Sequence, residues 1–284
     1  MREHTHGFCE GDVVIFGIFV LSVSGWKATG VVAVVGNCFY MEAKRRYDYR
    51  IEPRDVDFTR RATVMSLVDY ILHTAGEDAD RNGFGVRDLN MHNASWVLTR
   101  LGLETYRMPE EYEDVSITTW VSDVSRAMTT RNFEVLDSDG GMVAAAVTNW
   151  AMIDLSARRM LDLHTLPAYD SMTQPFPVPV EMPRRLAAVR EPQNVSVRKV
   201  AYSDLDFNCH TNSVKYVEWV VDTLPLEVVV KGRMERLDIN FMHETRYGDA
   251  LSIASAEAEG TRCFEILAAD GTPACRMALR FSRE

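Results

Sequence analysis

The chain has 284 residues, of which 46% are hydrophobic and 25% charged, so it can bury a large core without disulfides or metal ions. Its formal net charge of -10 argues against nucleic acid as a partner, because phosphate binding requires a basic surface. The five cysteines are odd in number and form no C-x-x-C pair. We therefore expect no disulfide framework, metal or cofactor, and a reducing, cytoplasmic location.

Residues 1–40 differ from the rest of the chain. Their apolar runs, at 13–21 and 31–35, are shorter than the ~20 residues that span a bilayer. A signal peptide is only weakly indicated, because Arg2 is the only basic residue before the first run. Met41 begins a segment typical of a cytosolic start, so we interpret residues 1–40 as an over-extended reading frame outside the fold, and expect no membrane association.

The rest of the chain contains an internal repeat. Residues 57–63 align with residues 206–212, and an apolar stretch with helical spacing follows each of them. Further on, residues 131–136 align with residues 262–267, and an Asp-Gly pair typical of a hairpin turn follows in both copies. The matches occur in the same order, which indicates a duplication.

Each copy predicts one helix followed by several strands. The first helix begins near Val64, and Ala75-Gly76 offers a stop. The second is capped by Asn212 or Ser213 and ends before Pro225.

Alternating apolar and polar residues, as in 115–120 and 237–241, predict strands with one buried face. One helix against a long antiparallel sheet, twice over, is an α+β, double hot-dog pattern. We expect one copy in residues 41–170, a proline-rich linker in 171–192 and the second copy in 193–284.

The two copies differ in the polar residues that precede the helix. The second copy has Asp206, Asn208 and His210 where the first has Asp, Thr and Arg. If this segment is extended, the three side chains share one face and Cys209 points away, which argues against a Cys209–His210 dyad. A histidine at a helix N-terminus can transfer protons where an oxyanion is stabilised. The alternative is that these side chains only hold a loop.

A complementary carboxylate is available after the strand at 237–241. Strand alternation places His243 and Glu244 on opposite faces, so only one can face the site, and spacing does not decide which. Tyr247 stands where an H-E-x-x-H zinc site would have its second histidine, so no zinc site is expected.

Residues 202–219 resemble the signature of the acyl-acyl carrier protein thioesterases of plants and bacteria. Residues 96–100, 119–121, 131–133 and 150–154 also resemble the first half of that family. The resemblance covers residue 47 to the C-terminus and is closer to the bacterial branch. It implies a double hot-dog enzyme that hydrolyses the thioester of fatty acyl-acyl carrier protein and releases free fatty acid.

The resemblance also implies which residues act. Asp206, Asn208 and His210 fall on the family's catalytic D-x-N-x-H motif, and its catalytic glutamate falls on Glu244. Plant members carry a cysteine next, where this chain has Thr245, so a cysteine nucleophile is not expected. We expect Glu244 and His210 to activate a water instead.

By the same analogy the first copy forms the acyl pocket. The candidates for that pocket, each of which could equally be core, are Val64, Met65, Val68, Ile71 and Trp96. An acidic carrier protein as partner requires a local basic surface, for which we select Arg184 and Arg185. The alternatives are an acyl-CoA thioesterase or dehydratase on the same fold and a non-enzymatic acyl-binding module; a homodimer is left open.

Overall fold

The structure is a computed structural model that describes residues 44–165 and 172–282. These residues belong to one compact unit. The predicted extension, residues 1–40, lies outside the described residues. Among the helices of the described part, none has the length and apolar character needed to cross a membrane.

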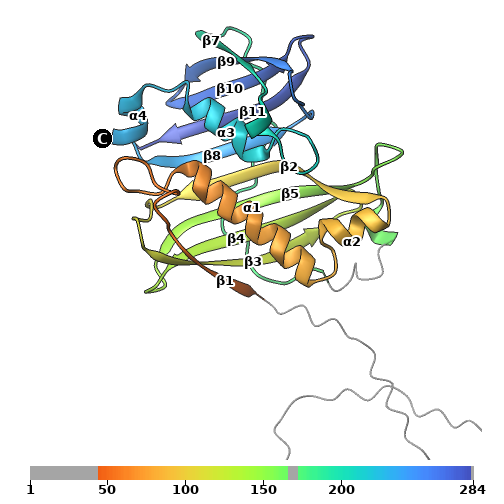
Figure 1. Ribbon diagram of the computed structural model, residues 1–284. Helices are drawn as coiled ribbons and strands as arrows, with labels where there is room; N and C mark the ends of the chain where they lie inside the picture. The colour runs from red at the N-terminus through yellow and green to blue at the C-terminus, as the bar shows by residue number, and fades with distance from the viewer. Residues whose placement is uncertain (1–43, 166–171, 283–284) are drawn as a thin grey trace, which may run out of the picture. The chain divides into compact units, whose positions relative to one another are not determined.

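The chain forms a helix-and-strand unit twice in succession (Figure 1). The first copy contains β1 (Arg45–Arg50), α1 (Val64–Arg81), α2 (Val86–Met91), β2 (Ala94–Thr105), β3 (Asp114–Val124), β4 (Met128–Asp137), β5 (Met142–Asp154) and β6 (Arg159–Met160). The second contains β7 (Asn194–Lys199), α3 (Ser213–Val221), α4 (Leu226–Lys231), β8 (Met234–Phe241), β9 (Ala250–Ala258), β10 (Thr261–Ala268) and β11 (Pro273–Phe281). The predicted strands at 115–120 and 237–241 lie in β3 and β8.

The strands form one antiparallel sheet in the order β1-β3-β4-β5-β2-β8-β11-β10-β9-β7, with β6 paired to β5. The last five strands repeat the order of the first five in reverse, so that each strand has a counterpart in the other copy. At the centre β2 pairs with β8, and Leu101 lies opposite Ile239. The matching segments 131–136 and 262–267 lie in β4 and β10, which are counterparts, so the sequence repeat is a structural repeat.

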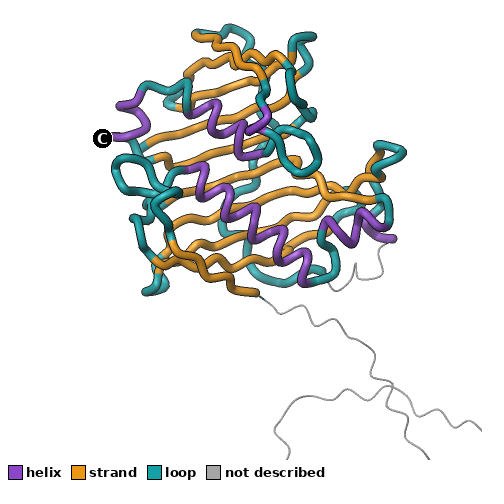
Figure 2. The backbone as a smooth tube through the Cα atoms, viewed as in Figure 1, coloured by secondary structure: helices purple, strands orange, loops and turns teal. Residues whose placement is uncertain are grey.

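Helices α1 and α3 lie on the same face of this sheet (Figure 2). A single hydrophobic cluster contains residues of both helices and of the central strands, including Val68, Leu101 and Val217, all fully buried. Because the apolar area of both copies is buried in one cluster, the hydrophobic effect stabilises the two copies together.

Helix α1 begins as predicted but continues past the predicted stop. Thr63 caps it, since its side chain accepts a hydrogen bond from the Ser66 N–H. The predicted end at Ala75-Gly76 is wrong: a glycine within a helix costs only about 1 kcal/mol. The following turn is retained because Asp78 is buried in an ion pair with Arg131.

Helix α3 agrees with the prediction at both ends. The Asn212 side chain accepts the Val214 N–H at 2.9 Å and caps the start. The helix ends at Val221, and Pro225 precedes α4 as its N-cap.

The linker between the copies crosses the face of the sheet opposite α1 and α3. Arg236 of β8 donates to the Glu181 carbonyl at 2.5 Å, and Asn240 of β8 accepts the Leu186 N–H at 2.8 Å. Residues between them in β8, such as Ile239, pack in the core shared with the helices. Alternate side chains of a strand point to opposite faces. Arg236 and Asn240 therefore share one face and Ile239 points to the other, so the linker lies on the side of the sheet away from the helices.

Candidate active site

The polar residues before α3 lie in a tight turn. The Asp206 N–H donates to the His210 carbonyl at 2.8 Å, and the Cys209 N–H donates to the Asp206 carbonyl at 3.1 Å. Cys209 has a φ of 60°. The prediction of an extended segment with three side chains on one face is therefore wrong, because an aspartate can bind its own nearby amides and close a turn instead.

The Asp206 carboxylate holds this turn together. Its Oδ1 accepts the N–H groups of Asn208 and His210 at 2.8 and 3.1 Å. The first copy contains the same turn, in which Asp57 Oδ1 accepts the Thr59 N–H at 2.7 Å. The turn is thus a scaffold common to both copies, and they differ in the side chains that it presents.

Glu244 meets His210 beside this turn. Strand β8 ends at Phe241, so the alternation used to orient the next residues stops before it reaches them. His210 Nε2 lies 3.2 Å from Glu244 Oε2, whereas His243 Nδ1 lies 2.8 Å from the Pro273 carbonyl. Of the two residues that the strand pattern left open, Glu244 is the one that pairs with His210.

Two arginines outside the predicted catalytic set surround this pair. Arg158 Nη2 lies 2.6 Å from Glu244 Oε2. Arg246 Nη2 lies 3.2 Å from His210 Nε2 and 3.8 Å from Glu244 Oε2. Arg158 belongs to the turn between β5 and β6 of the first copy, so no local pattern near Glu244 indicates this contact. Arg246 follows Glu244 closely in sequence, and that closeness could have identified it as a candidate site residue.

The Thr245 hydroxyl, at the position where plant members have a cysteine, is buried and fully engaged. It lies 2.6 Å from Thr211 Oγ1 and 2.8 Å from the Tyr216 hydroxyl. Burial raises the pKa of Tyr216 to about 12, so its phenol stays neutral. Cys209 is exposed, and its thiol makes no hydrogen bond to a described residue. Neither side chain has the partner that an activated nucleophile requires.

The N-terminus of α3 offers an amide that its cap does not use. The Val214 N–H donates to the Asn212 side chain, and the Lys215 N–H donates to the Asn212 carbonyl. The Ser213 N–H donates to no described residue, and Ser213 lines a cavity. Asn208 lines the same cavity with a side chain that has no hydrogen-bond partner among the described residues. These two groups can bind an oxyanion or a polar ligand atom.

This cavity, of about 780 Å³, extends from the His210–Glu244 pair into the first copy. Its apolar lining there includes Leu72, Ala75, Trp96, Leu98, Trp150 and Ile153. The second copy contributes Asn208, His210, Tyr216, Phe241 and Glu244. An apolar cavity of this size with a few convergent polar groups is typical of a small-molecule site.

The residues predicted for the acyl pocket separate into two groups. Trp96 lines the cavity. Val68 and Ile71 are fully buried in the core, and Val64 and Met65 pack against it; none of these four lines the cavity. The side of α1 that lines the cavity carries Leu72, Ala75, Gly76 and Ala79.

The two arginines selected for carrier binding lie away from this site. Arg184 and Arg185 are exposed on the linker, which crosses the face of the sheet opposite α1 and α3. Arg184 pairs there with Glu181 at 3.2 Å. A carrier contact at Arg184 and Arg185 therefore stays a prediction that this placement does not support.

Comparison with known proteins identifies the fold. The crystal structure of an acyl-ACP thioesterase from Bacteroides thetaiotaomicron has a TM-score of 0.79 and 34% identity, over 84% of this chain and 98% of that chain. The 12:0-ACP thioesterase from Umbellularia californica has the same fold, with a TM-score of 0.75 and 16% identity over 86% and 98% of the two chains. The chain is an α+β protein with the predicted double hot-dog fold.

The sequence comparisons identify the family. Residues 42–165 match the acyl-ACP thioesterase N-terminal domain, and residues 188–282 match the acyl-ACP thioesterase C-terminal domain. The chain belongs to the acyl-ACP thioesterase family. It is 25% identical over 254 residues to a chloroplastic oleoyl-acyl carrier protein thioesterase of Coriandrum sativum. That match covers 80% of this chain and 66% of the relative. It spans 54% of an acyl-[acyl-carrier-protein] hydrolase of Cuphea viscosissima, so these relatives are considerably longer.

Proposed function

We propose that the chain hydrolyses the thioester of fatty acyl-acyl carrier protein and releases free fatty acid. The observation that carries this proposal is the His210–Glu244 pair, 3.2 Å apart, at one end of a largely apolar cavity. The family and the names of the relatives support a carrier-bound acyl thioester as the substrate. The described cysteines are free, which is compatible with the predicted cytoplasmic location.

The contacts of His210 Nε2 suit proton transfer. Arg246 can only donate a hydrogen bond to this atom, and Glu244 can only accept one from it. Nε2 therefore accepts a hydrogen bond from Arg246 when it is unprotonated and donates one to Glu244 when it is protonated. The pair can accept a proton from water and then stabilise the charged imidazolium, as a general base requires.

In the proposed reaction, a water oxygen attacks the thioester carbonyl carbon while its proton moves to the His210–Glu244 pair. The Ser213 N–H, at the positive end of α3, and Asn208 donate to the oxyanion that forms. The C–S bond then breaks, and the thiolate takes the proton from His210, which leaves a carboxylic acid and a thiol. Asp206 is a positioning residue, because both of its amide partners lie in the turn.

Steady-state hydrolysis with one acyl chain on two carriers, acyl carrier protein and CoA, tests this proposal. We expect Glu244→Gln and His210→Ala each to lower kcat by about 10²- to 10⁴-fold. Arg61→Ala is the matched control, because Arg61 occupies the position of His210 in the first copy and is exposed; it should keep wild-type kcat.

The possible outcomes separate the alternatives. Near wild-type kcat in both active-site variants would reject the catalytic assignment. A higher kcat/KM with CoA than with the carrier protein would favour the acyl-CoA thioesterase. Tight binding of the acyl chain without any turnover would identify an acyl-binding module.

A further inference from the structure

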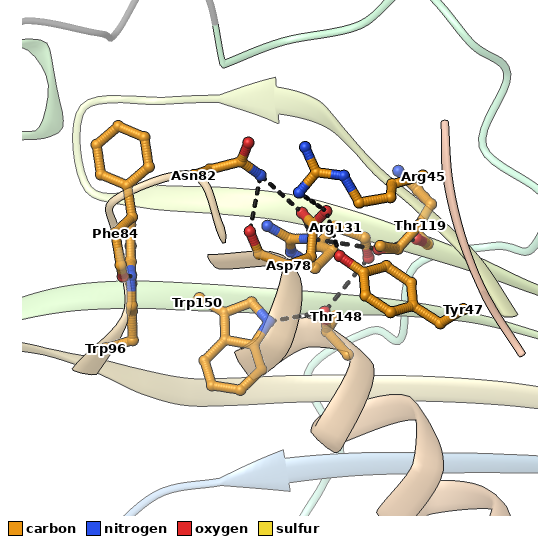
Figure 3. Close-up of polar contacts among 11 residues, drawn as sticks. Arg45, Tyr47, Asp78, Asn82, Phe84, Trp96, Thr119, Arg131, Thr148 and Trp150 are labelled. Carbon is orange, nitrogen blue, oxygen red and sulfur yellow. Dashed lines mark hydrogen bonds and ion pairs between the residues drawn. The ribbon is translucent and has the colours of Figure 1, made fainter. Parts of the chain in front are cut away.

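A buried ion pair lies at the part of the cavity that is remote from His210. Arg131 of β4 and Asp78 of α1 are 9% and 5% exposed, and Arg131 Nη1 lies 2.5 Å from Asp78 Oδ2 (Figure 3). Strand β4 is separated from β8 by β5 and β2, which is three strand spacings or about 14 Å. Arg131 is also among the residues that line the cavity, although the walls around it are largely apolar.

Asp78 is held in place by several further groups. The Tyr47 hydroxyl donates to its Oδ1 at 3.0 Å, and Asn82 Nδ2 donates to its Oδ2 at 3.2 Å. Figure 3 shows Tyr47 of β1, Arg131 of β4 and Asn82, the C-cap of α1, converging on Asp78. A carboxylate with this many partners fixes the position of the guanidinium that it binds.

The guanidinium of Arg131 is only partly satisfied. Its hydrogen bonds to described residues, with Asp78 and with Thr119 Oγ1 at 3.3 Å, both use Nη1. The Nε and Nη2 donors have no partner among the described residues. Because Arg131 lines the cavity, a molecule in the cavity can reach this side chain.

An acyl chain that enters from the His210 side approaches Arg131 with its terminal methyl group. A methyl group that reached Arg131 would remove water from N–H donors and offer no hydrogen bond in return, which is unfavourable for a charged group. The same donors can bind a terminal hydroxyl. The Trp96 and Trp150 rings, which line the cavity in this region, are compatible with a methylene chain up to that point (Figure 3).

We infer that Arg131, positioned by Asp78, is a specificity-determining residue that limits the acyl chain to one whose terminal methyl stops short of the guanidinium. This inference rests on the proposed function for its substrate class. It predicts that chain length is limited by the solvation of a charge as well as by the volume of the cavity.

The test is the product profile of the purified protein on a series of acyl-carrier substrates of increasing length. Arg131→Met, which removes the charge but keeps a long side chain, should shift the preferred length upward by two or more carbons. For the first chain beyond the wild-type limit, kcat/KM should rise about tenfold. Arg131→Lys should keep the wild-type profile. A wild-type enzyme should also hydrolyse a long chain that ends in a hydroxyl faster than the methyl-ended chain of the same length.

Arg276→Met is a matched control. Arg276 pairs with Glu265 at 2.7 Å, and the two side chains are 14% and 6% exposed, against 11% and 6% for Arg131 and Asp78. Arg276 does not line the cavity. Its substitution removes a comparable buried ion pair and should leave the length profile unchanged. The inference is overturned if Arg131→Met also leaves the profile unchanged, or if Arg276→Met shifts it equally.

Two further measurements keep the inference testable. Arg131→Met leaves Asp78 with only the more distant Arg45, whose Nη1 lies 3.6 Å from Asp78 Oδ1. If that variant does not fold, the double variant Asp78→Asn/Arg131→Met removes both charges of the Arg131–Asp78 pair and should give the same shift. If the wild type hydrolyses no substrate, the proposed function fails by itself. Binding of free fatty acids of increasing length then tests the limit directly, and equal length limits in wild type and variant would reject it.

Discussion

Arg158 Nη2 lies 2.6 Å from Glu244 Oε2, so that a turn of the first copy contacts the proposed catalytic carboxylate of the second. The Arg158 side chain is 53% exposed, and its backbone has a φ of 53°. An exposed ion pair contributes about 0–1 kcal/mol. The contact therefore orients Glu244 and contributes little to the stability of the fold.

Arg158→Gln should accordingly lower kcat/KM by no more than about fivefold, which corresponds to ~1 kcal/mol. The midpoint of thermal unfolding should stay close to the wild-type value. Arg159→Gln, an exposed neighbour in β6, is the control and should have no effect on either quantity. A hundredfold loss of kcat in Arg158→Gln would instead show that Arg158 acts directly on the reacting group.

The two equivalent turns allow the scaffold role of Asp206 to be separated from its effect on hydrolysis. Asp206→Ala and Asp57→Ala each remove the hydrogen bonds that close one turn, so each should lower the free energy of unfolding by ~1–2 kcal/mol. Only Asp206→Ala should also lower kcat, by about tenfold or more, because only that turn positions His210. Urea unfolding and steady-state rates measure the two effects. Equal kcat in the two variants would contradict the positioning role.

Cys209 occupies a left-handed conformation that cysteine adopts only at some cost. Asparagine tolerates this conformation, so Cys209→Asn should raise the free energy of unfolding by ~0.5–1 kcal/mol. Arg60 has the same backbone conformation in the first copy, with a φ of 61°, but its side chain pairs with Glu111, so Arg60→Asn should gain less stability than Cys209→Asn. Hydrolysis by Cys209→Asn should remain within about twofold of wild type, and its complete loss would mean that the thiol takes part in the reaction.

Tyr216 provides a test based on pH. Tyr216→Phe removes one of the two hydrogen bonds of the Thr245 hydroxyl and should cost ~1 kcal/mol of stability near pH 8. The folded state raises the pKa of Tyr216 from 10.0 to about 12. This contribution to stability is therefore complete below pH 10.0 and is lost as the pH rises toward about 12.

Urea unfolding of wild type and Tyr216→Phe at about pH 8 and about pH 11 should show the difference between them shrinking at the higher pH. The pH dependence of kcat should be the same in both proteins around neutral pH, where the phenol does not ionise. A shift of that profile in Tyr216→Phe would argue that Tyr216 exchanges protons during the reaction.

The features that could be predicted from the sequence depend on short-range rules. The order of matching segments revealed the duplication, and alternation located β3 and β8. Capping chemistry placed the start of α3 at Asn212 or Ser213, and in the structure the Asn212 side-chain oxygen binds a helix amide two residues away. The identity of the His210 and Glu244 candidates came from the motif, whereas their distance of 3.2 Å could come only from the structure.

The remaining features depend on contacts between segments that are distant in sequence. The Arg158–Glu244 and Arg131–Asp78 pairs join residues from different elements, so no local pattern predicts them. The helical spacing in α1 identified its apolar side, but only the packing of β2 and β5 against that helix decided which of its residues meet the cavity. The sequence by itself thus determined one helix and the main strands of each copy, their repeat and the chemical types at the site, but not the short helices α2 and α4. Tertiary structure decided which side chains face one another, because strand pairing and core packing bring them together through space.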